Sequence, residues 1–595
     1  MFAGARRWFT RAMERKQNER PAALHADGSS GGTNTSIDES IESAGNLISK
    51  GEVGPAQRLL EIIARESPRA IDRAAANSMP ANLLQDAGEH AQARVAVERA
   101  LGDAPDDADL NYRAGVHALA AGEAELALDY FRLCRYYDHS NFAACAGEVK
   151  ALQALARDSA CGELLSTFLA SCPGHRPAML ELAIWHYRHG EFDEALMLLE
   201  PLAEESPSDP EACNLLGLIL GRGLGRIDEA IKIFERALSI RPGWTVSLCN
   251  LGWMLSEAGR HAQGLEIIND VLLSTPGDSE ARLIRAYMNL KHGKFSNGWR
   301  DYDARHESGM AVSRPYHFPR WNGECGHGAT LLIYAEQGLG DQLMFSSCVL
   351  EAAARVGRVF LECHPNLVSL FSRSFPSVSV AAQVPPGAEP SWLETAGRID
   401  YQIAMGDLPA LFRNDWSDFP ERPGYLKADP GRIGYWRTRL EAMGPGIKVG
   451  LSWRGGIKAT RRQLRSFAPA TFSPLFRDGF QFVSLQYGDV AEDLAEMAQT
   501  GLDIAHWPEA IADYDNTAAL ICALNQVVSV CTAVIHLCGA LGRPALVLVP
   551  KVAEWRYLYD GEKMPWYPSV NLIRQRRVGE WEDVLTEAGR QLART

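Results

Sequence analysis

One stretch of the sequence, Glu336-Gln337-Gly338-Leu339-Gly340-Asp341, decides the fold expected for the C-terminal half of the chain. It follows an apolar run at 330–334 that predicts a buried strand, and it precedes residues 342–356, which predict a helix. A strand, a glycine turn and a helix start form a seat for nucleotide phosphates. Glycine allows close backbone approach, and the helix end offers free N–H donors.

Asp341, at the tip of this turn, has two interpretations that can coexist. A carboxylate beside phosphate-binding N–H groups would repel a pyrophosphate unless it faces elsewhere, so Asp341 could face an acceptor hydroxyl as a general base. Alternatively, it caps the following helix.

A dinucleotide site is an alternative for the same turn. Gly338 and Gly340 match the first two glycines of G-x-G-x-x-G, but Leu343 replaces the third, which normally permits close packing of helix on sheet. Glu362 ends the next expected strand, where a dinucleotide fold places its ribose-binding acid.

After residue 330, short apolar runs alternate with helical segments. This alternation predicts parallel sheets covered on both faces, with ligands at the carboxyl ends of the strands. The strands fall into two blocks, split near 434–445, and so predict two Rossmann-like lobes with a cleft between them. The expected strands are 331–334, 359–362, 378–381 and 401–404, then 449–452, 482–486, 527–530, 545–549 and 570–573.

A basic loop follows the first strand of the second block. Residues 448–466 hold six basic residues and no acid, although the whole chain has a formal net charge of −14. A positive, glycine-containing loop at a strand end suits a leaving phosphate, whose negative charge grows as a glycosidic bond breaks. The alternative is a solvated surface loop.

A second helix start follows the expected strand at 527–530. Thr532 is predicted to be its N-cap, so this helix end could also face an anion. His536 lies one turn further on and is either a packed side chain or a substrate contact. Cys531, His536 and Cys538 do not predict a metal site, because residues 536 and 538 point to nearly opposite sides of a helix.

The first half of the chain is repetitive. Most repeat steps are 34 residues or twice that, and the step into the glycine-rich turn at 221–226 is 35. Two helices per period of about 34 residues predict a tetratricopeptide solenoid. Its concave surface is either a groove for a protein or peptide, or a scaffold or dimerisation element. The turn glycines are Gly88, Gly122, Gly190, Gly225, Gly259 and Gly293, with Ala156 in one such position, and small residues follow at Ala93, Ala127, Ala195, Ala230 and Gly264.

Composition narrows the function classes. The 595 residues suggest about four domain-sized units. The acidic balance argues against general nucleic-acid binding, and no stretch is long and apolar enough to span a bilayer. Twelve scattered cysteines favour reduced thiols in a cytoplasmic protein.

The N-terminal segment is basic. Arg6-Arg7 suggests a twin-arginine export signal, but no apolar region follows, so export is not expected. Residues 1–20 are either a frayed tail or a basic amphipathic helix that touches a partner or membrane surface. Residues 27–36 read as a flexible linker.

The C-terminal half resembles the bacterial tetratricopeptide-linked glycosyltransferases of the two-lobed GT-B fold. It is similar to the lipopolysaccharide heptosyltransferases and, in overall plan, to the O-linked N-acetylglucosamine transferases. The matching pieces include Pro319-Arg-Trp321-Asn-Gly323, Glu336-Gln-Gly-Leu-Gly-Asp341, Val449-Gly-Leu-Ser-Trp453, Arg465-Ser466, Ser484-Leu-Gln486, Thr532-Ala533, His536-Leu537, Trp555-Arg556 and Pro565-Trp-Tyr-Pro568.

This resemblance implies an inverting, metal-independent protein O-glycosyltransferase with Asp341 as the acceptor-side base. It needs no cofactor and uses a CMP-, UDP- or ADP-linked sugar as donor. The acceptor would be Ser or Thr of a protein docked on the repeats, with flagellin as one candidate. Donor binding is implied for Gly338, Gly340, Trp453, Arg454, Lys458, Arg465, Gln486, Thr532, Ala533 and His536.

Two departures from the family pattern bear on the donor. Cys531 and Asn516 stand where relatives usually have Asp, so two carboxylates are missing from the donor side. A donor with its own carboxylate, such as a CMP-linked nonulosonic acid, would then be repelled less. Alternatively, this half has lost donor binding.

The expected organisation has four parts: a flexible segment at 1–36, a tetratricopeptide superhelix at 37–306, an acceptor-side lobe at 307–435 and a nucleotide-sugar lobe at 436–595. Two other functions remain open. One is a non-enzymatic adaptor with a relic GT-B half, and the other is a lipopolysaccharide-core transferase with a lipid-anchored acceptor.

Overall fold

A computed structural model describes most of the chain: residues 34–50, 52–86, 88–205, 208–312, 314, 316–385, 388, 390–456 and 458–594. The basic segment at 1–20 and the first part of the expected linker, 27–33, lie outside these residues. The last three linker residues begin helix α2 (Asn34–Ser49). The chain forms two compact units, Met1–Ala178 and Met179–Thr595, which divide inside the repeats.

The first unit contains helical repeats. Each repeat is a helix pair closed by a tight turn; Gly88 and Gly122 adopt φ of +78° and +83° there, and Ala156 adopts +56° in the equivalent position. Ala93 and Ala127 are fully buried between paired helices, as predicted. The helices are α2, α3 (Val53–Glu66), α4 (Ala70–Asp86), α5 (His90–Asp103), α6 (Ala108–Ala120), α7 (Ala124–Tyr137), α8 (Phe142–Ala154) and α9 (Ser159–Ser171).

The second unit opens with further repeats. The predicted turn glycines Gly190, Gly225, Gly259 and Gly293 all have φ between +70° and +84°. The helices are α10 (Arg176–His189), which crosses the division, α11 (Phe192–Glu205), α12 (Pro210–Leu218), α13 (Ile227–Ile240), α14 (Thr245–Glu257), α15 (His261–Ser274), α16 (Ser279–Lys291), α17 (Phe295–Tyr302) and α18 (Ala304–Glu307).

A π-helical turn explains the single 35-residue step. Helix α12 continues into η1 (Ile219–Gly223), where the N–H of Leu224 donates to the carbonyl oxygen of Ile219 at 2.9 Å. A π turn accommodates one extra residue within a helix. The insertion is therefore absorbed before α13, and the pairing of the following helices keeps its register.

Gly264 allows the closest helix approach in the last repeats. A Cβ at this position would lie 2.3 Å from the carbonyl oxygen of Gly252 on α14, whereas one at the solvent-facing Gly277 would meet nothing within 4 Å. We expect Gly264→Ala to destabilise the second unit by about 1–3 kcal/mol, despite alanine's better helix propensity. Thermal unfolding of the full chain would show a lowered transition, with Gly277→Ala as the matched control. Equal midpoints for the two variants would contradict this packing.

The repeat turns of the second unit lie against the C-terminal α/β region. A Cβ on Gly225 would contact Val578, one on Gly259 would lie 2.8 Å from the hydroxyl of Tyr559, and one on Gly293 would meet Trp416. In addition, the Tyr559 N–H donates to the carbonyl oxygen of Lys291 at 2.8 Å. This edge of the repeats is therefore an internal surface of the unit.

A buried ion network joins the last helix of the repeats to the smaller sheet. Arg305 on α18 is 2% exposed, and its Nη2 lies 2.9 Å from Glu336 Oε1 and 2.6 Å from Asp407 Oδ1. Burial works to raise the pKa of Asp407, but a hydrogen bond from His306 and the charges of Arg305 and Arg320 outweigh it and lower that pKa to about 2. The turn that carries Asp341 is thus anchored at its first residue.

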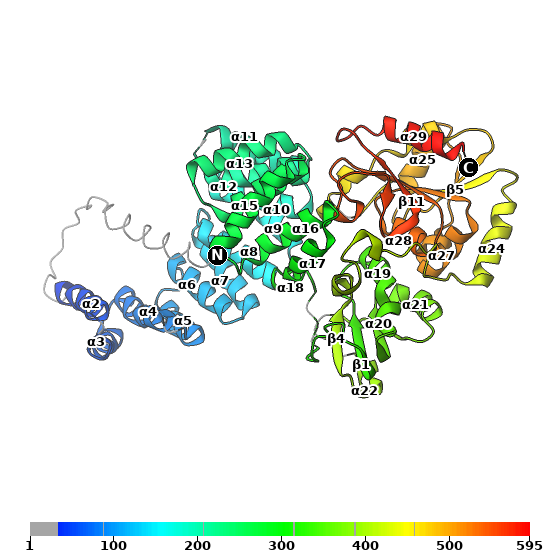
Figure 1. The fold of residues 1–595 in the computed structure, drawn as a ribbon. Helices are drawn as coiled ribbons and strands as arrows, with labels where there is room; N and C mark the ends of the chain where they lie inside the picture. The colour runs from blue at the N-terminus through cyan, green and yellow to red at the C-terminus, as the bar shows by residue number, and fades with distance from the viewer. Residues whose placement is uncertain are drawn as a thin grey trace. The chain divides into compact units, whose positions relative to one another are not determined.

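The smaller sheet has four parallel strands in the order β3-β2-β1-β4. Figure 1 shows β1 and α20 of this region in green and β4 and α22 in yellow-green. Its elements are β1 (Gly326–Tyr334), α19 (Leu339–Phe345), η2 (Ser346–Cys348), α20 (Val349–Ala353), β2 (Val356–Cys363), η3 (Pro365–Leu367), α21 (Val368–Ser374), β3 (Ser379–Ala382), α22 (Trp392–Ala396), β4 (Tyr401–Ala404), η4 (Met405–Asp407), α23 (Leu408–Phe412) and η5 (Trp416–Asp418).

The larger sheet has the order β10-β11-β9-β8-β5-β6-β7, and every neighbouring pair is parallel except β10 with β11. Its elements are α24 (Pro430–Glu441), β5 (Ile447–Ser452), η6 (Lys458–Thr460), η7 (Arg462–Arg465), η8 (Pro469–Leu475), β6 (Phe480–Ser484), α25 (Ala491–Gln499), β7 (Ile504–Ala505), α26 (Pro508–Ala512), α27 (Tyr514–Ala523), β8 (Gln526–Val530), α28 (Ala533–Ala540), β9 (Ala545–Val549), η9 (Trp555–Tyr557), β10 (Lys563–Met564), β11 (Tyr567–Arg574) and α29 (Glu582–Leu592).

Both faces of this sheet are covered. Val527 belongs to the core that includes α28, whereas its neighbour Val528 packs in the core that includes α29. Figure 1 shows β11 between α28 and α29 accordingly. The nine predicted strands and their parallel arrangement are confirmed, with β6 lying two residues before its expected position. The sequence did not predict β7 and β10, which have two residues each.

Candidate functional site

The candidate residues lie where strand order reverses in the two sheets. In the smaller sheet the chain leaves β1 for β2 and β3 on one side and later returns to β4 on the other, so the β1–α19 turn lies at this reversal. In the larger sheet the same reversal falls between β5 and β8. Ligands of open α/β sheets bind at the carboxyl ends of strands at such points. Asp341, the basic loop and Thr532 all follow these strands.

Asp341 is held by an arginine from the other sheet region. Gly338 is the N-cap residue of α19 and makes no side-chain cap, and the Asp341 carboxylate does not cap the helix. Instead, Asp341 Oδ1 accepts from Arg556 Nη2 at 2.6 Å, and no described residue donates to Oδ2. Asp341 is therefore not a helix cap. It forms an ion pair with Arg556 through one carboxylate oxygen, and the other accepts no hydrogen bond from a described residue.

Arg556 is part of a chain of charged side chains with alternating sign: Asp341, Arg556, Glu554 and Arg461. Burial opposes its charge, but Asp341 and Glu554 outweigh burial and raise the pKa of Arg556. Glu554 in turn forms an ion pair with Arg461 from the basic loop. Burial works to raise the pKa of Glu554, but the charges of Arg461, Arg556 and Arg465 hold it well below its usual value. The site thus contains two fixed carboxylates among three cations.

The two glycine-turn helices touch at Gly340. A Cβ on Gly340 would lie 3.1 Å from Cδ2 of His536 and 3.7 Å from the Cα of Ala533. A side chain at position 340 would therefore crowd the contact of α19 with α28. Gly340 faces protein here, and phosphate binding by Gly338 and Gly340 stays a prediction.

Two further residues of the basic loop, besides Arg461, form ion pairs. Arg454 Nη2 lies 2.7 Å from Asp493 Oδ2 on α25. Lys458 is 66% exposed, and its Nζ lies 3.4 Å from Glu191 Oε1 in the repeat turn before α11. Arg454 therefore points toward α25, and Lys458 contacts the repeats.

Arg465 is the basic-loop residue best placed to meet an anion. Its guanidinium donates to the carbonyl oxygens of Gly455 at 3.1 Å and Thr460 at 2.9 Å, and to the Thr460 hydroxyl at 2.7 Å. A longer contact of 3.5 Å reaches the carbonyl oxygen of Cys531. None of these acceptors carries a formal charge, and the described residues provide Arg465 with no ion pair. Its position is fixed, and its charge acts on Glu554 without a direct ion pair.

Trp453 and Gln486 support the loop from inside, which corrects their prediction as donor-binding side chains. Trp453 is fully buried and packs edge-on against Phe472. Gln486 is 1% exposed, and its Oε1 accepts from the Ser452 hydroxyl and from the N–H groups of Trp453 and Arg454 at 2.8–3.1 Å. Both side chains are buried within the protein.

The start of α28 confirms one prediction and decides between two others. Thr532 is the N-cap, and its Oγ1 accepts from the Val534 N–H at 3.2 Å. The N–H of Ala533 has no acceptor within the helix, because the first N–H groups of any α-helix lack one. His536 is a packed residue: Nδ1 lies 3.1 Å from the hydroxyl of Tyr567. Burial, together with Arg556, holds the pKa of His536 well below its usual value, so the ring is neutral.

The structure contradicts the dinucleotide alternative. Glu362 is fully buried, accepts a hydrogen bond from the hydroxyl of Tyr316 and lies 3.4 Å from Arg314 Nε. Burial raises the pKa of Glu362. A carboxyl group enclosed in this way cannot reach a ribose.

The residues that replace the usual acids differ in exposure. Cys531 is buried against β9, and burial raises the pKa of its thiol to about 12, so the position is neutral. Asn516 is partly exposed on α27, and its Nδ2 lies 3.4 Å from the carbonyl oxygen of Glu509. Neither position carries a negative charge.

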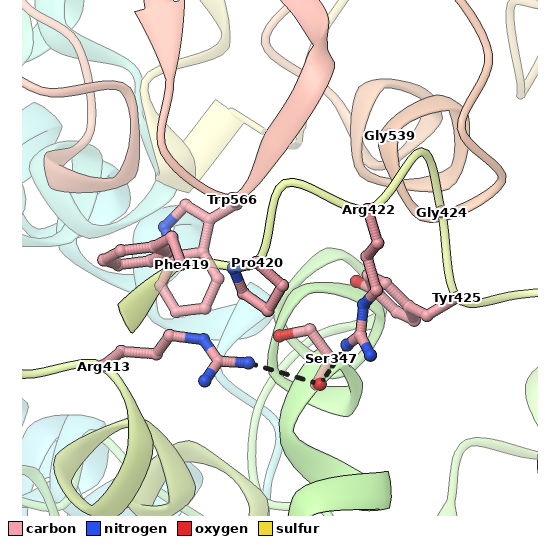
Figure 2. Close-up of a pocket in the computed structure, with 9 residues that line it drawn as sticks. All are labelled: Ser347, Arg413, Phe419, Pro420, Arg422, Gly424, Tyr425, Gly539 and Trp566. Carbon is pink, nitrogen blue, oxygen red and sulfur yellow. Dashed lines mark hydrogen bonds between the residues drawn. The ribbon is translucent and has the colours of Figure 1, made fainter. Parts of the chain in front are cut away.

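A small cavity lies beneath the contact of the two sheet regions. Arg413 and Arg422 converge on the carbonyl oxygen of Ser347, at 3.4 and 2.6 Å, beside Phe419 and Trp566 (Figure 2). The cavity measures about 10 Å³. This is room for about one water molecule and excludes a nucleotide.

Within the described ranges, no cluster of His, Cys, Asp or Glu side chains could hold a metal ion. Over the same residues, no helix is long and apolar enough to cross a membrane. The sequence interpretation missed the roles of Arg556, Glu554 and Arg461 in the chain of alternating charges. Trp555-Arg556 is part of the family resemblance, but the partner of Arg556 lies 215 residues away in sequence and leaves no local signal.

Comparison with known proteins identifies the repeats and a relative of most of the chain. A tetratricopeptide-repeat family profile matches residues 79–135 and 180–243. Protein FlbA of Caulobacter vibrioides is 31% identical over 471 residues, which cover 70% of this chain and 78% of that protein.

Solved structures match about a third of this chain. YrrB, described as a TPR protein with an unusual peptide-binding site, is 19% identical and matches with a TM-score of 0.26, covering 31% of this chain and 95% of that one. PilF of Pseudomonas aeruginosa is 16% identical and matches with a TM-score of 0.31, covering 36% of this chain and 96% of that one.

Fold and sequence together define the class: a tetratricopeptide-repeat protein with a C-terminal α/β region built on parallel sheets. The repeats indicate a protein-interaction role. The chain belongs to the family of Protein FlbA.

Proposed function

We propose that this protein is a protein O-glycosyltransferase of the GT-B type, with Asp341 as its base and the basic loop and α28 as its donor side. The proposal rests on one observation: each sheet has a point where its strand order reverses, and the candidate residues lie at these two points. Asp341 follows β1 in the smaller sheet. Arg465 lies in the loop after β5, and Thr532 follows β8, both in the larger sheet. The smaller sheet thus provides the Asp341 carboxylate, which has one oxygen without a hydrogen bond from a described residue. The larger sheet provides the Arg465 guanidinium and the N-terminus of α28.

The proposed reaction is a single displacement. The hydroxyl oxygen of an acceptor Ser or Thr attacks the anomeric carbon of the donor sugar and passes its proton to Asp341 Oδ2. The bond between the anomeric carbon and the phosphate oxygen breaks, and the nucleotide leaves with that electron pair. Arg465 and the free N–H at the start of α28 stabilise the negative charge on the leaving phosphate. The sugar inverts its configuration, and no metal takes part.

The same region suggests which donor and which acceptor to test. Cys531 is a buried neutral thiol at a position where the resembling family usually has a carboxylate, so we propose a sugar that carries its own acid, such as a CMP-linked nonulosonic acid. The acceptor would dock on the repeats, and flagellin is the first acceptor to test.

Intact-mass spectrometry of a co-expressed acceptor tests this function. The expected result is a discrete added mass of one sugar on Ser or Thr, which appears only with the full chain. A fragment that starts at residue 173, before α10, retains the whole second compact unit and is the suitable truncation. An unmodified acceptor in the presence of all three nucleotide-sugar classes would contradict the proposal.

One observation favours a second candidate, an adaptor without activity. Asp341 is paired to Arg556, and α19 packs on α28 at Gly340. A protein in which this contact never opens would bind its partner through the repeats alone. Thermal stabilisation by a nucleotide sugar separates the two candidates, because an adaptor gains none.

A further inference from the structure

Tyr487 presents an aromatic ring beside the proposed donor site. It follows β6 at the carboxyl edge of the larger sheet and is 43% exposed. A single exposed aromatic residue is not unusual by itself. Here, however, its hydroxyl accepts a hydrogen bond from the N–H of Gly456 at 3.0 Å. The ring is therefore held in place while much of its surface stays open.

Gly456 joins this ring to the guanidinium of Arg465. It adopts φ of +73°, and a Cβ at this position would lie 2.1 Å from Arg465 Nη2. One backbone residue thus separates the hydroxyl of Tyr487 from the guanidinium of Arg465. Arg454, by contrast, is paired with Asp493 and turned toward α25.

We propose that Tyr487 is the stacking platform for the nucleobase of the donor, and that Arg465 binds the phosphate attached to the same nucleoside. The assignment rests on the proposed function only in taking the donor to be nucleotide-linked. Stacking on an aromatic face tolerates every base, because each base has a π face. The platform therefore contributes affinity and leaves the choice of base to other contacts.

Calorimetric titration of the full chain with CMP, UMP, AMP and inorganic phosphate tests this subsite. We expect Tyr487→Ala to weaken the binding of all three nucleotides about tenfold, the loss typical of one stacked base. Tyr487→Phe retains the stacking face and should keep most of the affinity. Arg465→Met should weaken binding of phosphate as well as of the nucleotides. Tyr435→Ala, at another exposed tyrosine on α24, is the matched control and should change nothing.

Three outcomes would overturn the platform: wild-type protein that binds no nucleotide, Tyr487→Ala with wild-type affinity, or Tyr487→Phe as weak as Tyr487→Ala. The last would show that the hydroxyl positions the loop and that the ring does not stack. Failure of the proposed function is separable from these. If nucleotide binding depends on Tyr487 but no acceptor receives a sugar, the nucleobase subsite is supported and the proposed transferase activity is contradicted.

Discussion

Asp341→Asn should reduce sugar transfer by about 10²- to 10⁴-fold, the usual contribution of a general base, while nucleotide binding is retained. The amide keeps the shape of the side chain and can still accept from Arg556, but it cannot take the acceptor proton. The measurement is the rate at which acceptor mass increases, with nucleotide affinity determined on the same preparation.

A control for this variant is Asp478→Asn, which removes a carboxylate from an exposed loop before β6. It should transfer at the wild-type rate. The thermal midpoint of Asp341→Asn must also be compared with that of the wild type, because the ion pair with Arg556 is weakened. Transfer at the wild-type rate by Asp341→Asn would assign the base to another residue.

Arg305→Met should destabilise the second unit by about 3–5 kcal/mol, the cost of removing one partner from a buried ion network. Methionine fills much of the same space, but it leaves Glu336 and Asp407 buried without the cation that both contact. Arg305→Lys keeps the positive charge but lacks the planar guanidinium group. Its free energy of unfolding should therefore lie between those of Arg305→Met and the wild type.

Chemical unfolding followed by tryptophan fluorescence measures this effect, because Trp299 and Trp321 belong to the core that the network adjoins. Arg300→Met, at an exposed arginine on α17, is the matched control and should change stability by less than about 0.5 kcal/mol. Equal unfolding curves for Arg305→Met and Arg300→Met would show that the network adds no stability.

The same network gives a pH dependence with a defined sign. The pKa of Asp407 is lowered from its ordinary 3.8 to about 2 in the folded protein. A lowered pKa means that the unfolded chain takes up the proton more readily. The contribution of Asp407 is therefore complete above pH 4 and is lost as the pH falls toward 2. Wild-type stability should decrease across this range more steeply than that of Arg305→Met.

The regular elements were predictable because their signals are local. A glycine near each repeat turn reports a positive φ, and Ala156 adopts the same conformation where the period demands it. The 35-residue step likewise locates one extra residue near the glycine-rich turn at 221–226. Its form as a π turn could not be predicted, because a longer loop would satisfy the same spacing.

The site was predicted less completely, for two physical reasons. Trp453 continues the alternation of Val449 and Leu451, which marks it as a core residue, but the neighbouring charges drew the interpretation toward a ligand. Arg556 and Asp341 meet only through the tertiary fold, and neither residue's neighbours specify the partner. Whether Asp341 acts as a base, and which sugar it would serve, stays a prediction.

The hydrophobic core of the second unit includes Leu283 and Leu290 of α16 together with Leu331 of β1 and Val547 of β9. The last repeat and both sheets therefore share one interior. A partner that binds these repeats only in their folded form would stabilise the sheets as well, by mass action. When a partner occupies the repeats, protease should therefore cleave the whole C-terminal region more slowly, even at sites that the partner does not contact.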